Sequence, residues 1–536
     1  MTKHLDDGLE DGLDPAVAGV LRDWAELHNR FYELVHWLVN GRSRAPVAVV
    51  RETDADAETT TVLILKILGV HSGPVRDIEY GRHRRAEREA PGFAKAHLST
   101  FAHEAITAPG RRWITFQRIA GKSLEKTEVL TVLLRRMLGI ADEVEPTGTA
   151  LITCDPPTFA DACRKVVAGV LWDWAGPPFI PPGERWNVAT FFRRHLLDQM
   201  EPGGRLAGWA QRHQGEEVVL AGEAKPLPNP FAVAQGRYFS DAVVVTPFLS
   251  RCHGDLHSDN ALVRVRPSIE AGDYYLIDTA LYESSGPLTR DPVHFVLYII
   301  ARSMEAIKAP SQQAALIDLL LDPLEGPAHL VPGWLAMLVQ QVDAEAVAWV
   351  EPTGLALTWR EQTYLSLTAC AMLFLGRTST REEDKPWFFR LAARAAARFA
   401  RLHPDTRLVR DAGLSRDSRT TAVTAGPWIG WLCRDRPDME QAAKQQARQD
   451  EARKYCEDAL SGLDRTNEYR EFVREIGGPD PDVRFGTRGN EGQSEPEDYL
   501  CPLDLCARRE RRLPGGAKPV CNLNRVSRLT LRSSLD

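Results

Sequence analysis

The stretch His253-Gly-Asp-Leu-His-Ser-Asp-Asn260, followed later by Ile277-Asp278, limits what this chain can fold into more than any other. Asp255 is a carboxylate that can accept a proton from a hydroxyl group. Asn260 and Asp278 carry the oxygen ligands that Mg²⁺ prefers beside nucleotide phosphates. Either fragment alone would be an ordinary turn or a solvated strand end, but both in this order predict a phosphoryl-transfer site.

The residues between the two fragments predict a β-hairpin. Residues 261–265 and 274–277 are short apolar runs, and the segment 267–273, which contains proline and glycine, predicts the turn that joins them. Asp278 then ends a strand beside the loop that holds Asp255.

At these residues the chain resembles the aminoglycoside phosphotransferase and choline kinase branch of the protein-kinase-like fold, whose signature is His-Gly-Asp-Leu-His-x-x-Asn followed by Ile-Asp. The resemblance implies an α+β, bilobal fold with a small antiparallel β N-lobe and a mainly helical C-lobe. It implies that Asp255 is the catalytic base, that Asn260 and Asp278 bind Mg²⁺, and that ATP donates a phosphoryl group to a hydroxyl-bearing acceptor. His253 would brace the loop rather than react.

An N-lobe of this kind also needs a turn that faces phosphate. Residues 33–39 and 46–50 are two β-rich runs joined by a polar turn, in which Asn40, Gly41 and Ser43 are the candidate phosphate contacts through backbone N–H groups. The turn contains a single glycine, so it is a weak signal on its own.

A strand lysine and a helix glutamate complete the predicted phosphate site. Residues 61–68 predict a buried strand, in which Lys66 needs an anionic partner; a lysine that snorkels from a strand edge is the alternative. The helix predicted over 77–89 offers Glu79, favoured because it lies in the first turn, and Glu87 as the alternative.

Residues 112–121 predict the last N-lobe strand and a hinge, where Gln117 to Ile119 would contact the adenine ring. Glu79-x-x-x-His83, residues 90–98 and Phe116-Gln-Arg-Ile-Ala-Gly121 also resemble bacterial ternary-complex-associated domains, which are kinase-like modules of predicted signalling and conflict systems. That resemblance covers about residues 30 to 300 and specifies no acceptor. The competing hypothesis is therefore a catalytically weak or inactive module that binds a nucleotide or a partner.

The length of 536 residues predicts two to three domains. Helices are expected at 124–138 and 188–197, and Asp291 is expected as the N-cap of a further helix. The predicted segments are an N-terminal lead at 1–29, the N-lobe at 30–120, the helical C-lobe at 121–405 with an insertion at 125–247, a polar helical extension at 406–477, a linker at 478–498 and a Cys-containing tail at 499–536.

Composition limits the partners. The formal net charge of −7 argues against general nucleic-acid binding. No apolar run is long enough to cross a membrane, and the acidic N-terminus lacks a secretory signal, so a cytoplasmic location and no membrane partner are expected.

The tail holds three of the nine cysteines: Cys501, Cys506 and Cys521. Such a cluster in a cytosolic chain predicts thiolate ligands for Zn²⁺, although the tail offers no histidine or further cysteine as a fourth ligand. Free thiols in a disordered tail are the equal alternative. A tail that binds a protein partner, with the rest as its scaffold, is a third hypothesis for the function.

Overall fold

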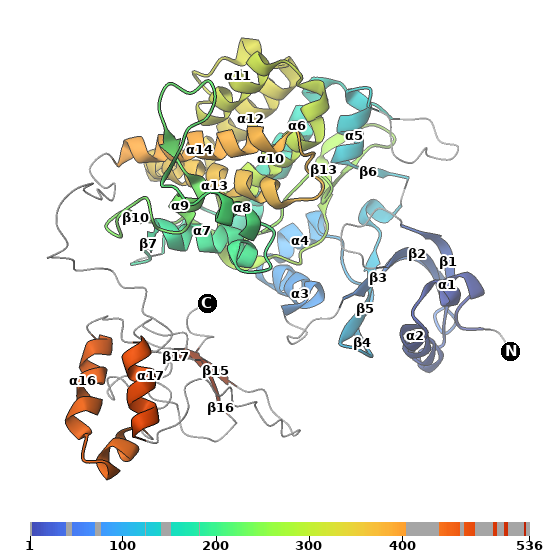
Figure 1. Ribbon diagram of the computed structural model, residues 1–536. Coiled ribbons are helices and arrows are strands. Elements are labelled where there is room, and N and C mark those ends of the chain that lie inside the picture. Colours follow the sequence, from blue (N-terminus) through green and yellow to red (C-terminus); the bar gives the residue numbers. More distant parts are fainter. Residues whose placement is uncertain are drawn as a thin grey trace. The chain divides into compact units, whose positions relative to one another are not determined.

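The computed structural model describes residues 3–38, 46–69, 77–123, 125–140, 152–181, 183–403, 439–460, 466–476, 497–500, 509–512 and 530–531. The chain divides into two compact units, Met1–Arg410 and Asp411–Asp536. The first unit has an antiparallel sheet in its N-terminal part and helices in its C-terminal part (Figure 1), which confirms the predicted α+β class.

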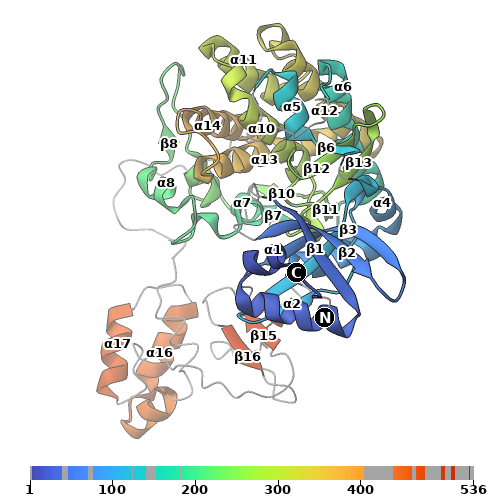
Figure 2. The same ribbon diagram turned by 90° about the vertical axis from the view of Figure 1, so that its right-hand side faces the viewer.

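The N-terminal sheet has five antiparallel strands in the order β1-β2-β3-β5-β4. Figure 2 shows the sheet at one end of the first unit, beside the helical part. The strands are β1 (Arg30–Trp37), β2 (Val47–Asp54), β3 (Thr59–Leu68), β4 (Ile106–Ala108) and β5 (Arg112–Arg118).

Two N-terminal helices, α1 (Asp7–Gly12) and α2 (Pro15–Leu27), share one apolar core with the sheet. Leu63, Leu65 and Ile67 of β3 belong to that core. Because side chains alternate along a strand, Lys66 projects from the opposite face. The helices α3 (Glu79–Glu89) and α4 (Pro91–His97) follow β3 in the chain.

A second core fills the helical part of this unit. Its helices are α5 (Leu130–Met137), α6 (Pro156–Ala168), α7 (Val188–Leu196), α8 (Ala207–Arg212), α9 (Pro230–Ala234), α10 (Arg290–Ser303), α11 (Pro310–Leu321), α12 (Gly333–Val350), α13 (Ala356–Gly376) and α14 (Lys385–Leu402). Within the described residues, none of the helices combines the length and the apolar character that a bilayer crossing needs.

Short strands position the candidate site within the helical part. The predicted hairpin forms from β12 (Ala261–Arg264) and β13 (Glu270–Leu276), and β6 (Thr127–Val129) pairs with the other edge of β12. The remaining pairs are β11 (Leu249–Cys252) with β14 (Glu283–Pro287), β7 (Trp186–Asn187) with β10 (Val244–Val245), and β8 (Glu217–Val218) with β9 (Leu227–Pro228).

The prediction of one helix over residues 124–138 is wrong at its start. Thr127 pairs with Arg264 of the hairpin, and the helix begins only at Leu130. A helical spacing of apolar residues does not reveal a strand partner that lies far away in the sequence, and the ladder hydrogen bonds override the local preference.

The second unit contains helices α16 (Gln449–Leu460) and α17 (Thr466–Glu475) and a sheet in the order β16-β15-β17. Tyr455 contacts Tyr469 and Phe472, with ring centroids 5.7 and 4.9 Å away. The strands are β15 (Glu497–Leu500), β16 (Arg509–Arg512) and β17 (Thr530–Leu531). Cys501, Cys506 and Cys521 lie outside the described residues.

Candidate active site

The loop between β11 and β12 carries the motif that begins at His253. Gly254 has a φ of +79°, and a Cβ atom at this position would lie 2.0 Å from the carbonyl oxygen of Leu281. Only glycine meets both the backbone conformation and the close approach. The backbone geometry therefore requires glycine at the position before Asp255.

Two side chains brace this loop from different elements. The ring Nε2 of His253 lies 3.0 Å from the carbonyl oxygen of Ile277, which matches the bracing role expected of it. The carboxylate of Asp291 accepts hydrogen bonds from the backbone N–H groups of His253 at 2.6 Å and Gly254 at 3.0 Å. Asp291 is the second residue of α10 and not its N-cap, so its predicted capping role is wrong and its carboxylate serves the loop.

Hydrogen bonds also join Asn260 to the backbone of Asp255 and to that of Ile277, the residue before Asp278. The amide Nδ2 of Asn260 donates to the backbone carbonyl of Asp255 at 3.1 Å, and the backbone N–H of Ile277 donates to the carbonyl of Asn260 at 3.0 Å. Asp278 directly follows Ile277 and has a φ of +59°, a conformation that is uncommon outside glycine and asparagine or aspartate. The backbone hydrogen bonds thus join the motif loop to the end of the hairpin.

The structure places Lys66 of β3 against two carboxylates. Its Nζ atom donates to Oε2 of Glu79 at 2.5 Å and lies 3.7 Å from Oδ2 of Asp278. Burial opposes the charged form of Lys66, but the charges of Glu79 and Asp278 outweigh it and raise the pKa of the ammonium group. The alternative partner, Glu87, contacts Arg84 and His83 instead.

Helix α3 is also attached to the segment that follows Asp278. Nδ1 of His83 lies 3.1 Å from the hydroxyl oxygen of Thr279, and the hydroxyl group of Tyr282 donates to Glu89 at 2.6 Å. The helix that supplies Glu79 is therefore linked to the residue that follows Asp278. Sequence reasoning missed this role of His83, although the residue stands four positions after Glu79 on the same helix face.

Three further side chains surround the carboxylate of Asp255. His257 Nε2 lies 3.6 Å from Oδ2, while His294 Nδ1 lies 3.7 Å and Arg377 Nη2 lies 3.3 Å from Oδ1. Burial favours the neutral acid, but His294, His257 and Arg377 outweigh it and lower the pKa of Asp255 below its ordinary value. Burial and Arg377 lower the pKa of His294 well below its ordinary value, so this ring is neutral at neutral pH, and Arg377 keeps its positive charge beside Asp255. Asp255 is therefore ionised and can accept a proton.

For the remaining predicted residues, the described part of the chain shows no contact with Lys66, Asp255 or Asp278. Gln117 lies in β5, and its side-chain Nε2 donates to the carbonyl of Ser99 at 2.8 Å. Ile119 follows that strand immediately. The phosphate-turn candidates Asn40, Gly41 and Ser43 lie outside the described residues.

Asn260 and Asp278 supply a donor set that fits Mg²⁺. With Nδ2 of Asn260 directed to a carbonyl, the amide oxygen is the end of the group left for a cation, and Asp278 adds carboxylate oxygens. Magnesium is bound in proteins by one or two such side chains together with phosphate and water oxygens. Among the described residues, no group of three or more His, Cys, Asp or Glu side chains has the geometry of a metal site, but a site with one amide and one carboxylate is smaller than such a group.

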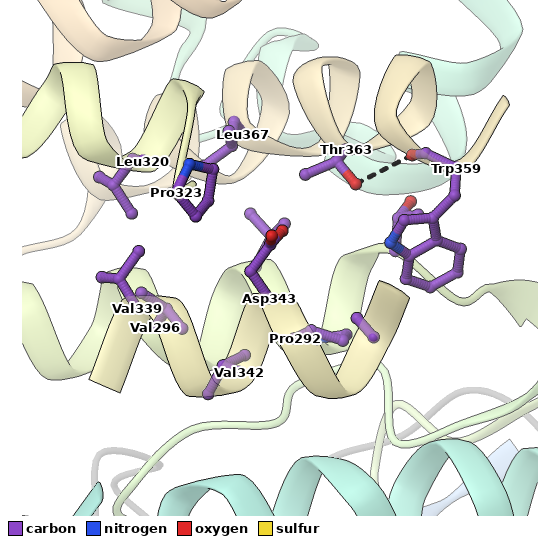
Figure 3. Close-up of a pocket in the computed structure, with 13 residues that line it drawn as sticks. Pro292, Val296, Leu320, Pro323, Val339, Val342, Asp343, Trp359, Thr363 and Leu367 are labelled. Atoms are coloured by element: carbon purple, nitrogen blue, oxygen red, sulfur yellow. Dashed lines mark hydrogen bonds between the residues drawn. The ribbon is translucent and has the colours of Figure 1, made fainter. Parts of the chain in front are cut away.

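A small cavity lies among the helices α10 to α13 (Figure 3), away from these residues. Its volume is about 50 Å³, and its lining is mostly apolar except for residues such as Thr363 and Asp343. Asp343 forms two hydrogen bonds to Arg360, at 2.8 and 2.9 Å. None of its lining residues is a predicted site residue.

Together, the sheet and the helical part have the α+β arrangement that the sequence predicts. No protein-family model matches the chain, and no curated protein matches it either. The resemblance to ternary-complex-associated domains thus receives no support from these comparisons.

Two solved structures are similar to this chain at a low level. One is a glucosamine kinase, which is 11% identical with a TM-score of 0.32 and covers 69% of this chain and 94% of its own. The other is a candidate aminoglycoside phosphotransferase from Ralstonia eutropha, which is 11% identical with a TM-score of 0.35 and covers 72% of this chain and 98% of its own. Similarity at this level assigns no function. A function for this chain therefore has to be argued from the geometry of the site.

Proposed function

We propose that this chain is a phosphotransferase that uses ATP and Mg²⁺ to transfer the γ-phosphoryl group to a hydroxyl acceptor. The observation that carries the proposal is the contact of Lys66 with both Glu79 and Asp278, at 2.5 and 3.7 Å. A buried strand lysine held between a helix carboxylate and the residue after the hairpin is the arrangement that positions nucleotide phosphates in kinases.

The nucleotide would be held by residues from both parts of the first unit. Lys66 would contact its phosphates, the turn with Asn40, Gly41 and Ser43 would cover them, and the backbone from Gln117 to Ile119 would contact adenine. Asn260 and Asp278 would hold Mg²⁺, which when bound neutralises charge on the phosphate oxygens. Most of the rate gain would come from positioning and from charge stabilisation.

Asp255 would act as the general base. The acceptor oxygen forms a bond to the γ-phosphorus, the bond from that phosphorus to the bridging oxygen breaks, and ADP leaves with its electron pair. The hydroxyl proton passes to the Asp255 carboxylate. The low pKa of Asp255 supports this role because the group is ionised before the acceptor arrives.

The proposal is tested by ADP formation from ATP and Mg²⁺, with water as the acceptor while the natural one is unidentified. Asp255→Asn should reduce the rate by about a hundredfold, within the range typical of general-base catalysis. Asp273→Asn is the matched control, because the side chains of Asp273 and Asp255 are both 33% exposed and Asp273 pairs with Arg264 within the hairpin. A wild-type protein that binds ATP but forms no ADP would favour the nucleotide-binding module instead.

The zinc site and the protein partner predicted for the tail form no part of this proposal, since Cys501, Cys506 and Cys521 lie outside the described residues.

A further inference from the structure

Arg377 reaches the candidate base from a distant part of the chain. It directly follows α13, and its Nη2 atom lies 3.3 Å from Oδ1 of Asp255 and 2.8 Å from Nε2 of His294. Neither Arg377 nor His294 belongs to the motif that begins at His253. The guanidinium group therefore joins the motif loop to two helices, α10 and α13.

The contacts of His294 define how Arg377 is held. Nδ1 of His294 lies 2.9 Å from the backbone carbonyl oxygen of Leu256, and a carbonyl oxygen can only accept a hydrogen bond. The ring proton is therefore on Nδ1, and Nε2 is the acceptor for Arg377. His294 thus fixes the guanidinium on one side and the backbone next to Asp255 on the other.

Aromatic rings enclose the same guanidinium group. Its Cζ atom lies 4.8 Å from the ring centroid of Phe374 and 5.7 Å from that of Tyr298. The Arg377 side chain is only 15% exposed, and its buried Nη1 atom has no hydrogen-bond partner among the described residues. Burying a charged group costs free energy, and an apolar side chain would often serve packing as well or better. The charge at this position therefore indicates a purpose beyond packing.

Asp291 and Asn260 hold the backbone of the loop. Asp291 accepts from the N–H groups of His253 and Gly254, and Asn260 donates to the carbonyl of Asp255. Arg377 Nη2 donates a hydrogen bond to the carboxylate itself, at Oδ1. The charged or titratable groups facing that carboxylate are His253, His257 and His294 together with Arg377, from the loop, α10 and the end of α13.

We infer that Arg377 is a positioning residue, which fixes Oδ1 of Asp255 and leaves Oδ2 to accept the proton of the acceptor hydroxyl. This inference rests on the proposed phosphotransferase function. It predicts a specific kinetic effect, because Lys66, Asn260 and Asp278 do not contact Arg377: loss of the guanidinium group lowers kcat and leaves the KM for ATP unchanged.

The test compares Arg377→Met and Arg377→Lys with the wild-type protein, again by ADP formation from ATP and Mg²⁺. Arg377→Met should reduce kcat about a hundredfold, the typical cost of misplacing a reacting group by about 1 Å, with the KM for ATP within about twofold. Arg377→Lys should be intermediate, and added methylguanidinium should restore part of the activity of Arg377→Met. Arg360→Met is the control, because Arg360 is also a buried arginine paired with a carboxylate, Asp343, but does not contact Asp255.

The inference is overturned if Arg377→Met keeps kcat within twofold, or if Arg377→Met and Arg360→Met lose activity equally. Should Arg377→Met fail to fold, Arg377→Lys and Arg377→Gln decide, since lysine lacks the planar fork of donors and glutamine lacks the charge. If the wild-type protein forms no ADP, the proposed function fails. Crystal structures of the variants then test the positioning role of Arg377 separately, through the orientation of the Asp255 carboxylate. A carboxylate of Asp255 that keeps its rotamer without the guanidinium group would contradict the positioning role, and one that rotates away would support it.

Discussion

Removing Lys66 should destabilise the first unit as well as weaken nucleotide binding. The side chains of Lys66 and Glu79 are only 18% and 6% exposed, so solvent screens their interaction little. Lys66→Met keeps most of the apolar stem but leaves the Glu79 carboxylate buried without its cation. Breaking a buried pair in this way costs about 3 to 5 kcal/mol of unfolding free energy.

A second substitution separates the two effects. In Lys66→Met combined with Glu79→Met, no buried charge is left unpaired, so about 2 kcal/mol or more of the lost stability should return. Affinity for ATP should stay at least about tenfold below that of the wild-type protein, equivalent to about 1.4 kcal/mol, because the phosphate-contacting cation is still missing.

Stability is measured by differential scanning calorimetry, where the single variant should lower the midpoint of the first unit, Met1–Arg410, by about 4 to 6 °C. Affinity is measured by isothermal titration with ATP and Mg²⁺. The control is Arg51→Met, which removes the exposed pair of Arg51 with Glu33 on the same sheet and should change neither value. The reasoning is refuted if the double variant is no more stable than the single one, or if ATP affinity recovers together with stability.

Three further predictions concern the site and its surroundings. Gly254→Ala should abolish ADP formation and lower the unfolding midpoint, because its Cβ would meet Leu281; an active, stable variant in the same assays would contradict that geometry. Asp291→Ala leaves the backbone N–H groups of His253 and Gly254 buried without an acceptor, which should cost about 2 kcal/mol in calorimetry and reduce ADP formation. Burial lowers the pKa of His195 to about 3, so below pH 6.5 the unfolded chain binds a proton that the folded chain does not, and stability should fall by about 2 kcal/mol between pH 7 and pH 5; a His195→Gln variant with an equal pH slope would argue against this.

The sequence was sufficient where short-range patterns decide the geometry. The apolar run around Lys66 predicted its strand, and the turn residues after β12 predicted the hairpin that ends at Asp278. The helix predicted after residue 77 was correct because Glu79 begins a continuous run that ends before Pro91. In each case the decisive interactions lie within one element or between neighbouring ones.

Contacts between distant elements could not be predicted in the same way. Arg377 and Asp255 are 122 positions apart, and the sequence around Arg377 carries no pattern that points to a carboxylate. Asp291 stands where a helix N-cap would be expected, and only the packing of α10 against the loop shows that its carboxylate binds the two backbone N–H groups there. Thr127 was assigned to a helix for the same reason, since its strand partner Arg264 lies far along the chain.

The most direct measurement is a crystal structure of the protein with Mn²⁺, in place of Mg²⁺, and a non-hydrolysable ATP analogue. We predict anomalous density for a cation bound by the side-chain oxygens of Asn260 and Asp278, phosphates in contact with Lys66, and a terminal phosphoryl group facing Asp255. A nucleotide bound elsewhere, or a cation that contacts neither Asn260 nor Asp278, would contradict the proposed phosphotransferase site.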